Sequence, residues 1–371
     1  MKHACPCLFA TSVLLVAPSS LVAGPGFAVE IFAAGDAAPR NSEGSIIALS
    51  GGRLLLASTR FVGGARDDSA AHIAAVRSRD GGRTWSEPVV LQENVGGKNV
   101  MSVSFARLAP TKNDDDTGPM GLFYLVKNGH DDLKIHLRVS RDEARTWSEP
   151  IVVTDRSGYH VMNNDRVRRL RSGRLLCPVA FTEHGTKVNH YRSRCFVSDD
   201  GGATWRAGKG EADVGKRGAM EPEVIEQRDG GLLMLMRTQF GRNYAARSTD
   251  GGETWDKPVP FGPAAPEAPS TLRRIPSTGD WLLIFNDSVD PDHHHHGERT
   301  PLTAAVSRDE GKTWTHRRNL ESDPESTYAY TSLIFVDDRA LMSYYVTKKG
   351  SSRLSLRFRS VPIAWFSAAT P

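Results

Sequence analysis

The amino-acid sequence predicts an all-β fold, a six-bladed β-propeller. The main observation is the motif S-x-D-x-x-x-T-W, which occurs five times. Its aspartates are Asp80, Asp142, Asp200, Asp250 and Asp309. They follow one another at intervals of 50 to 62 residues, the length of one four-stranded sheet with its loops. Such a spacing indicates radial repetition of a sheet around an axis. The second observation is a β-rich segment after the last motif, which begins at Thr327 and adds a sixth blade.

Each position of the motif suits a hairpin turn. The Asp carboxylate can accept backbone N–H groups across the turn, and the glycines supply the positive φ that the turn needs. Thr begins the outgoing strand, and the Trp ring packs between neighbouring sheets. We therefore interpret all five copies as structural.

The repeats share one order of elements. A polar entry leads into a β-rich run, a glycine turn, a second run, a loop and the motif hairpin. The expected inner strands begin near Arg40, Lys98, His160, Met220, Glu267 and Thr327. The sixth repeat has no motif, so its outer strand is expected from Phe27–Phe32 or from the run Leu354–Trp365.

The first 23 of the 371 residues have the pattern of a secretory signal peptide. A basic start precedes an apolar run from Leu8 to Ala17 and a small-residue region that ends at Ala23. The run is too short to span a membrane. Residues 24–371 show no break in composition and predict one propeller domain. The sequence thus predicts a secreted or periplasmic monomer without a membrane span.

The net charge and the motifs of the sequence limit the classes of ligand that we expect. A net charge of +4 with mixed signs gives no reason to expect nucleic acid and does not exclude an anionic small substrate. No phosphate-binding glycine loop and no zinc-type spacing occurs, so neither a cofactor nor a metal is predicted. The run His293–His296 is interpreted as a solvated loop, with a metal site as the alternative. Cys177 and Cys195 lie on nearby predicted strands, where a disulfide and two buried thiols are equally expected.

Polar residues gather where the inner strands begin. Because these strands line the central channel of a propeller, their first residues should converge at one mouth of it. The polar residues are Arg40, Glu43, Asn99, Asn163, Asn164, Asp165, Arg166, Glu221, Glu267 and Tyr330. A polar funnel of this kind is typical of a sugar-binding site, and the simpler alternative is a rim that only solvates the channel mouth.

The repeated motif resembles the Asp box, or BNR repeat, of sialidases. The resemblance covers nearly all of residues 24–371, and it implies three arginines that hold the carboxylate of an acidic sugar. Arg40 begins the first inner strand, Arg237 ends the second strand of the fourth repeat, and Arg299 precedes the strand before the fifth motif. Guanidinium grips a carboxylate through two parallel hydrogen bonds. The polar run that contains Asn164, Asp165 and Arg166 adds candidate substrate contacts.

The same resemblance implies a tyrosine nucleophile with a glutamate partner. The sugar carries its own carboxylate at the anomeric carbon, so a neutral phenol approaches more easily than a second anion. Tyr330 and Glu221 occupy the matching positions, and Tyr328 and Glu223 are the substitutes two residues away on the same strands. The acid/base is expected in the loop before the first motif, as Asp67 or Asp68.

The sequence also departs from the family pattern. Asn41-Ser42-Glu43 follows Arg40, where sialidases usually have an apolar residue and Pro. The resemblance therefore implies a retaining exo-glycosidase that releases terminal sialic acid or a related acidic sugar. The alternatives are a glycosidase for a different ulosonic or uronic acid and a non-catalytic carbohydrate-binding propeller.

Overall fold

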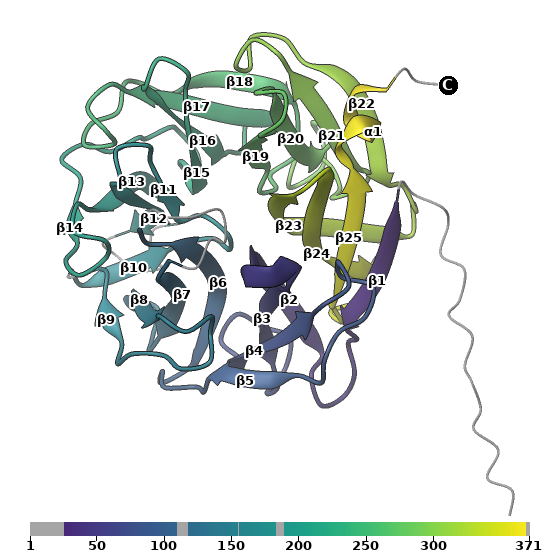
Figure 1. The fold of residues 1–371 in the computed structure, drawn as a ribbon. Helices are drawn as coiled ribbons and strands as arrows, with labels where there is room; N and C mark the ends of the chain where they lie inside the picture. Colours follow the sequence, from purple (N-terminus) through teal and green to yellow (C-terminus); the bar gives the residue numbers. More distant parts are fainter. Residues whose placement is uncertain (1–25, 110–117, 155, 183–188, 369–371) are drawn as a thin grey trace, which may run out of the picture.

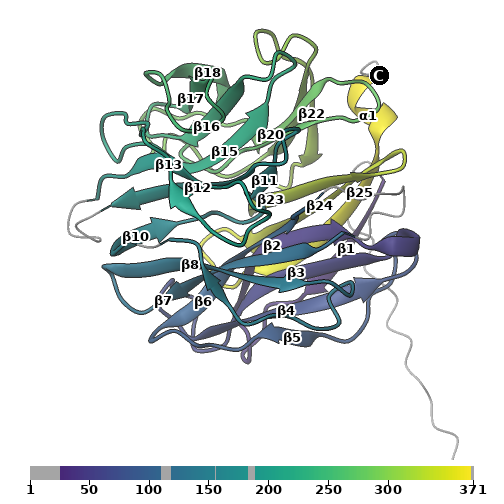
Figure 2. The same cartoon turned by 60° about the vertical axis from the view of Figure 1, so that its left-hand side comes forward.

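A computed structural model describes residues 26–109, 118–154, 156–182 and 189–368. The signal peptide predicted for residues 1–23 lies outside these ranges. Figure 1 looks along the axis of a ring in which β2, β6, β15, β19 and β23 surround the centre, and Figure 2 shows the ring turned by 60°. The prediction of an all-β propeller is confirmed.

Four of the sheets are four-stranded blades, each with neighbouring strands antiparallel. The first contains β2 (Arg40–Ala48), β3 (Leu54–Phe61), β4 (Ala71–Ser78) and β5 (Val89–Gln92). The next contains β15 (Met220–Glu226), β16 (Leu232–Arg237), β17 (Arg242–Ser248) and β18 (Val259–Ala264). The third contains β19 (Thr271–Arg274), β20 (Trp281–Asn286), β21 (Leu302–Ser307) and β22 (Thr315–Glu321). The fourth contains β23 (Ser326–Val336), β24 (Arg339–Lys348), β25 (Ser355–Pro362) and β1 (Phe27–Phe32).

The predicted number of six blades is wrong, because the described residues form four such blades and one continuous sheet of nine strands. This sheet contains β6 (Asn99–Arg107), β7 (Met120–Lys127), β8 (Asp132–Ser140), β9 (Ile151–Val152), β10 (Gly158–Val161), β11 (Arg168–Arg169), β12 (Leu175–Thr182), β13 (Arg192–Ser198) and β14 (Arg206–Ala207). The segment expected to begin an inner strand at His160 forms β10 instead. β10 pairs in parallel with β8 and antiparallel with β12. Its backbone hydrogen bonds therefore join what the repeat pattern presents as two separate sheets.

The two ends of the chain meet in one blade. β1 pairs with β25, and Phe27 lies opposite Ser360. Both segments proposed for the outer part of this blade belong to it, β25 as the third strand and β1 at the rim (Figure 1). The chain then ends in a short helix, α1 (Ile363–Ser367), which is the only helix with α geometry in the described ranges. No helix in those ranges has the length and apolar character needed to cross a bilayer.

The motif hairpins have the predicted geometry. Asp80 Oδ1 accepts the backbone N–H of Thr84 at 2.9 Å, and Oδ2 accepts its hydroxyl at 2.6 Å. Trp85 packs edge-on against Phe358 of the neighbouring blade, with ring centroids 5.1 Å apart. Analogous carboxylate contacts hold the other four turns. Each motif thus closes its own hairpin, and the first also packs on the next sheet.

A pair of glycine variants tests this packing. Gly81 and Gly82 both have positive φ, but an added Cβ meets open space at Gly81 and overlaps the Phe358 ring at Gly82. Gly81→Ala should lower the free energy of unfolding by about 1–2 kcal/mol, because of the left-handed backbone alone. Gly82→Ala should lower it by a further ~1–3 kcal/mol, because of overpacking. Chemical denaturation of both variants measures the difference, and equal losses would contradict the contact between these two blades.

Candidate active site

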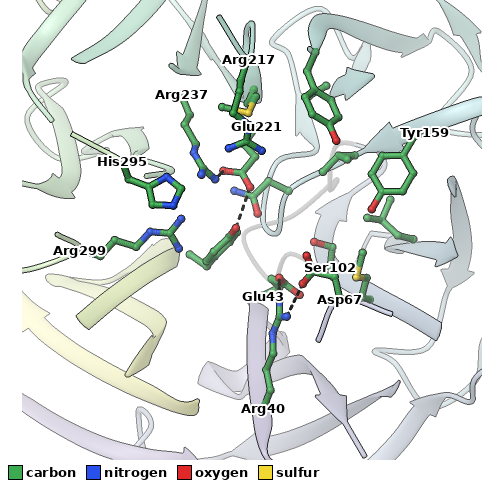
Figure 3. Close-up of a pocket in the computed structure, with 18 residues that line it drawn as sticks. Arg40, Glu43, Asp67, Ser102, Tyr159, Arg217, Glu221, Arg237, His295 and Arg299 are labelled. Atoms are coloured by element: carbon green, nitrogen blue, oxygen red, sulfur yellow. Dashed lines mark hydrogen bonds and ion pairs between the residues drawn. The ribbon is translucent and has the colours of Figure 1, made fainter. Parts of the chain in front are cut away.

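A pocket of about 340 Å³ lies where the inner strands begin (Figure 3). Its polar side consists of arginines, acids and the phenol of Tyr330, and its other side is apolar and aromatic. Two of the polar strand starts, Glu43 and Asn163, also line it. The lining residues that the sequence analysis did not single out as site candidates are Met101, Ser102, Leu125, Tyr159, Val161, Ala180, Tyr191, Arg217, Met220 and His295. The volume is in the range of small-molecule sites.

Backbone bulges direct four inner-strand residues into this pocket. The pairing register shifts within β2, β6, β15 and β23. At each shift one residue that lines the pocket has positive φ. The four are Glu43 (58°), Ser102 (61°), Glu221 (44°) and Tyr330 (60°). A bulge re-aims a side chain, and positive φ is strained for residues other than glycine. The four inner strands therefore hold a residue with strained, positive φ at four positions around one pocket.

The three predicted arginines reach the same pocket. Arg40 bonds to Glu43 at 2.7 Å and to Asp67 at 2.5 Å. Arg237 donates to Glu221 at 2.8 Å, and Arg299 donates to the hydroxyl of Tyr345 at 2.9 Å. The guanidiniums come from β2, from the end of β16 and from the loop before β21. Together they form a site with the charge and the donors to hold a carboxylate.

Tyr330 and Glu221 form a hydrogen-bonded pair. The Tyr330 hydroxyl donates to Glu221 Oε1 at 3.0 Å. Burial alone would raise the pKa of Glu221, but the charges of Arg237 and Arg299, with hydrogen bonds from Arg237 and Tyr330, lower it. Burial and the negative charge of Glu221 raise the pKa of Tyr330. The resting pair is thus a neutral phenol beside an ionised carboxylate.

Only one of the two acid/base candidates lines the pocket. Asp67 does so, and its side chain is 68% exposed beside Arg40. Asp68 bonds instead to Lys127 at 2.5 Å, outside the residues that line the pocket. The hydrogen bond from Lys127 lowers the pKa of Asp68. The structure therefore places Asp67 where a ligand could reach it.

The polar run of the third repeat lies beneath the pocket, in the central channel. Asn164 Nδ2 donates to the carbonyl of Gly44 at 2.7 Å and to that of Tyr330 at 3.0 Å. Asp165 accepts from the backbone N–H of Leu333 at 3.0 Å, and buried Arg166 lies 3.3 Å from Glu223. None of these three predicted substrate contacts is on the pocket wall.

The two substitute residues also lie away from the pocket. Tyr328 is buried, and its backbone N–H donates to the carbonyl of Arg299 at 2.8 Å. Glu223 is buried in the channel, where it pairs with Arg166, Arg168 and Arg273. Tyr328 and Glu223 pair regularly with the neighbouring strand, whereas Tyr330 and Glu221 lie in the bulges. Of these four residues, only Tyr330 and Glu221 therefore line the pocket.

Several pocket residues carried no signal that sequence reasoning could use. Arg217 lies in the loop before β15, and His295 lies in the histidine run that was interpreted as solvated. Tyr159 and Tyr191 come from the nine-stranded sheet and its loops. Glu267 was among the polar strand starts, but the sequence did not reveal its 2.7 Å contact with His295. That contact would have identified His295 as a pocket residue. Cys177 and Cys195 are free, buried thiols.

The fold and the site define a class, a propeller whose channel mouth combines an arginine cluster with a tyrosine–glutamate pair. Residues 56–342 match the family described as BNR repeat-like domain. The chain belongs to this family, and with it to the BNR propellers of the sialidase superfamily.

Individual relatives are distant. The sialidase of Bacteroides fragilis is 26% identical over 299 residues, which cover 72% of this chain and 53% of that protein. The chain thus spans about half the length of that relative. A Dyadobacter fermentans protein of unknown function has a similar structure, with a TM-score of 0.72 and 19% identity over 91% of this chain and 98% of that one. The Trypanosoma rangeli sialidase in complex with the inhibitor DANA has a TM-score of 0.71 and 17% identity, over 91% and 60% of the two chains.

Substitution of Glu223 tests whether the buried ion pairs beneath the pocket stabilise the fold. Glu223→Gln removes one charge among three arginines and should lower the free energy of unfolding by about 3–5 kcal/mol. Glu226→Gln, which removes the partner of exposed Arg171, is the matched control and should cost less than about 1 kcal/mol. Thermal and chemical unfolding of both variants measure the losses. Similar small losses would show that the buried cluster does not stabilise the ring.

Proposed function

We propose that this protein is a retaining exo-glycosidase that releases terminal sialic acid from glycoconjugates. The observation that carries the proposal is the hydrogen bond from Tyr330 to Glu221 in the same pocket as Arg40, Arg237 and Arg299. The family of the chain and its sialidase relatives support it. A neutral phenol as nucleophile suits a substrate that already carries a negatively charged carboxylate on its reacting carbon.

Substrate binding uses the arginine cluster. The three guanidiniums would hold the sugar carboxylate and place the anomeric carbon near the phenol. In the free protein Arg40 is shared by Glu43 and Asp67, and Arg237 is paired with Glu221. A ligand carboxylate would compete with these internal acids for the guanidinium N–H groups. Fixed charges that need no rearrangement during reaction stabilise the transition state most effectively.

The first chemical step forms a covalent intermediate. The Tyr330 oxygen attacks the anomeric carbon while its proton passes to Glu221, and the bond from that carbon to the leaving oxygen breaks. Asp67, in its protonated form, gives a proton to the leaving oxygen. Water then attacks the same carbon, Asp67 takes a proton from the water, and Tyr330 departs and recovers its proton from Glu221. Two inversions give overall retention.

A second candidate function changes only the sugar. Glu43 lines the pocket, and its Oε2 is buried without a hydrogen-bond partner among the described residues. Burial raises the pKa of this carboxyl group. An additional acid beside Arg40 favours a ligand with one more polar group than the family pattern accommodates. This observation supports a glycosidase for a different ulosonic or uronic acid.

The cellular setting is part of the proposal. The N-terminal pattern of residues 1–23 supports secretion or export to the periplasm, where extracellular glycoconjugates would be the substrates. We propose that the protein acts there as a monomer and without a cofactor.

Replacement of the nucleophile tests the proposal directly. Tyr330→Phe removes one oxygen and keeps the ring, so the fold should persist. Turnover of an aryl sialoside should fall by at least about 100-fold, because the covalent route is lost. Tyr328→Phe is the matched control on the same strand and should retain activity. A Tyr330→Phe enzyme that works at the parental rate would exclude this residue as nucleophile, and a wild-type protein inactive on every acidic glycoside would favour a carbohydrate-binding propeller.

The adjacent aspartates form a second matched pair. Asp67→Asn should lower kcat/KM, which reports the first step, by about 100-fold or more for a sialoside with a poor leaving group, since the leaving oxygen loses its acid. The loss should be much smaller for an activated aryl leaving group. Asp68→Asn should leave both rates close to wild type. Steady-state kinetics with the two substrates distinguish the roles, and the reverse pattern would assign the acid to Asp68.

A further inference from the structure

A buried carboxylate connects three side chains at one edge of the pocket. Glu267 has no exposed surface and accepts hydrogen bonds from Arg217 at 2.5 Å, Gln239 at 3.0 Å and His295 at 2.7 Å. Arg237 lies 3.7 Å from the same carboxylate. Two of these neighbours, Arg217 and His295, line the pocket but have no role in the chemistry proposed above.

The position of His295 is fixed twice by Glu267. The side-chain bond joins His295 Nδ1 to Glu267 Oε2, and the backbone N–H of Glu267 donates to the carbonyl of His295 at 2.7 Å. In Figure 3 the imidazole lies beside Arg237 and Arg299, toward the pocket. A residue held by both backbone and side chain is pre-organised for contact with a ligand.

The carboxylate also sets the chemistry of the ring. Because Glu267 accepts a hydrogen bond, Nδ1 must carry the proton, which leaves Nε2 as an acceptor in the neutral ring. Burial lowers the pKa of His295, as do the neighbouring His294 and Arg237, and these effects outweigh the opposing influence of Glu267. No described residue forms a hydrogen bond with Nε2. The imidazole thus offers a neutral acceptor beside Arg237 and Arg299, which can only donate.

We propose that His295, oriented by Glu267, is a specificity-determining residue that accepts a hydrogen bond from one hydroxyl group of the acidic sugar. The inference rests on the proposed function, because the arginines that would hold the sugar carboxylate lie beside this imidazole. A carboxylate or carbonyl oxygen would meet the Nε2 lone pair unfavourably, whereas a hydroxyl group can donate to it. His295 therefore selects a hydroxylated acid over an acid with an apolar group at that position.

Variants in the histidine run provide the test. His295→Phe keeps an aromatic ring but removes the acceptor, and His294→Phe is the matched control on the exposed neighbouring residue. The probes are an aryl sialoside and a set of mono-deoxy analogues, each without one hydroxyl group. Wild type and the His294→Phe variant should lose about 10- to 100-fold in kcat/KM on one analogue, mainly through KM. On the parent sialoside, the kcat/KM of His295→Phe should be lower than that of wild type by the same factor. His295→Phe should show no further loss of kcat/KM when that analogue replaces the parent sialoside. His295→Gln, whose amide oxygen can accept, should recover part of the loss.

Two results would overturn the inference. One is a His295→Phe enzyme with the parental kcat/KM. The other is a variant that still discriminates against every deoxy analogue as wild type does, which would indicate a merely structural role.

The proposed function can fail separately, if wild type turns over no sialoside. Calorimetric titration with N-acetylneuraminate and glucuronate then decides. Weaker binding of either acid by His295→Phe than by His294→Phe supports the inference. Equal binding by the two variants, or binding of neither acid to wild type, overturns it.

Discussion

Neutralisation of buried charge between the inner strands is the constraint on which this propeller depends. Asp165 is buried between these strands, bonded to the backbone of β23 through Leu333 and to Arg273 of β19. Glu223 of β15 pairs with arginines from both sides. Unpaired ions would be very costly at this depth, so the inner strands must keep one relative position. The floor of the pocket is therefore set by ion pairs that never meet the ligand.

The geometry of the pocket depends on the buried polar residues beneath it. Asn164 spans the gap between two inner strands by donating to the carbonyls of Gly44 and Tyr330, which lie within the bulges of β2 and β23. The strained backbone at Glu43 and Tyr330 is thereby held from below. Strain of this kind persists only where the surroundings over-determine it. The polar run of the third repeat thus contributes to the site through the backbone of its neighbours.

Sequence reasoning succeeded where a residue's role is local. The five motifs specify their own hairpins, since Asp80 bonds within its own turn. The three arginines were implied by the family resemblance, and the structure brings them to one pocket. It failed where sheets meet. The parallel pairing of β10 with β8 is made by Gly158 and Tyr159 with Asp132 and Leu133, all outside the motifs, and it replaces the expected six blades with four and a nine-stranded sheet. It could not separate Asp67 from Asp68, because Lys127, which holds Asp68, comes from another strand. His295 was invisible for the same reason, since its orientation depends on a buried carboxylate 28 residues away.

The pairing of β1 with β25 has a consequence for biosynthesis. Ring closure needs the first strand of the propeller to meet its last strand, since Phe27 lies opposite Ser360. Until β25 has been synthesised, β1 has no partner strand and its blade cannot form. Contacts so distant along the chain form slowly, because the loop must close before they stabilise anything. The propeller therefore stays open during elongation until β25 has left the ribosome.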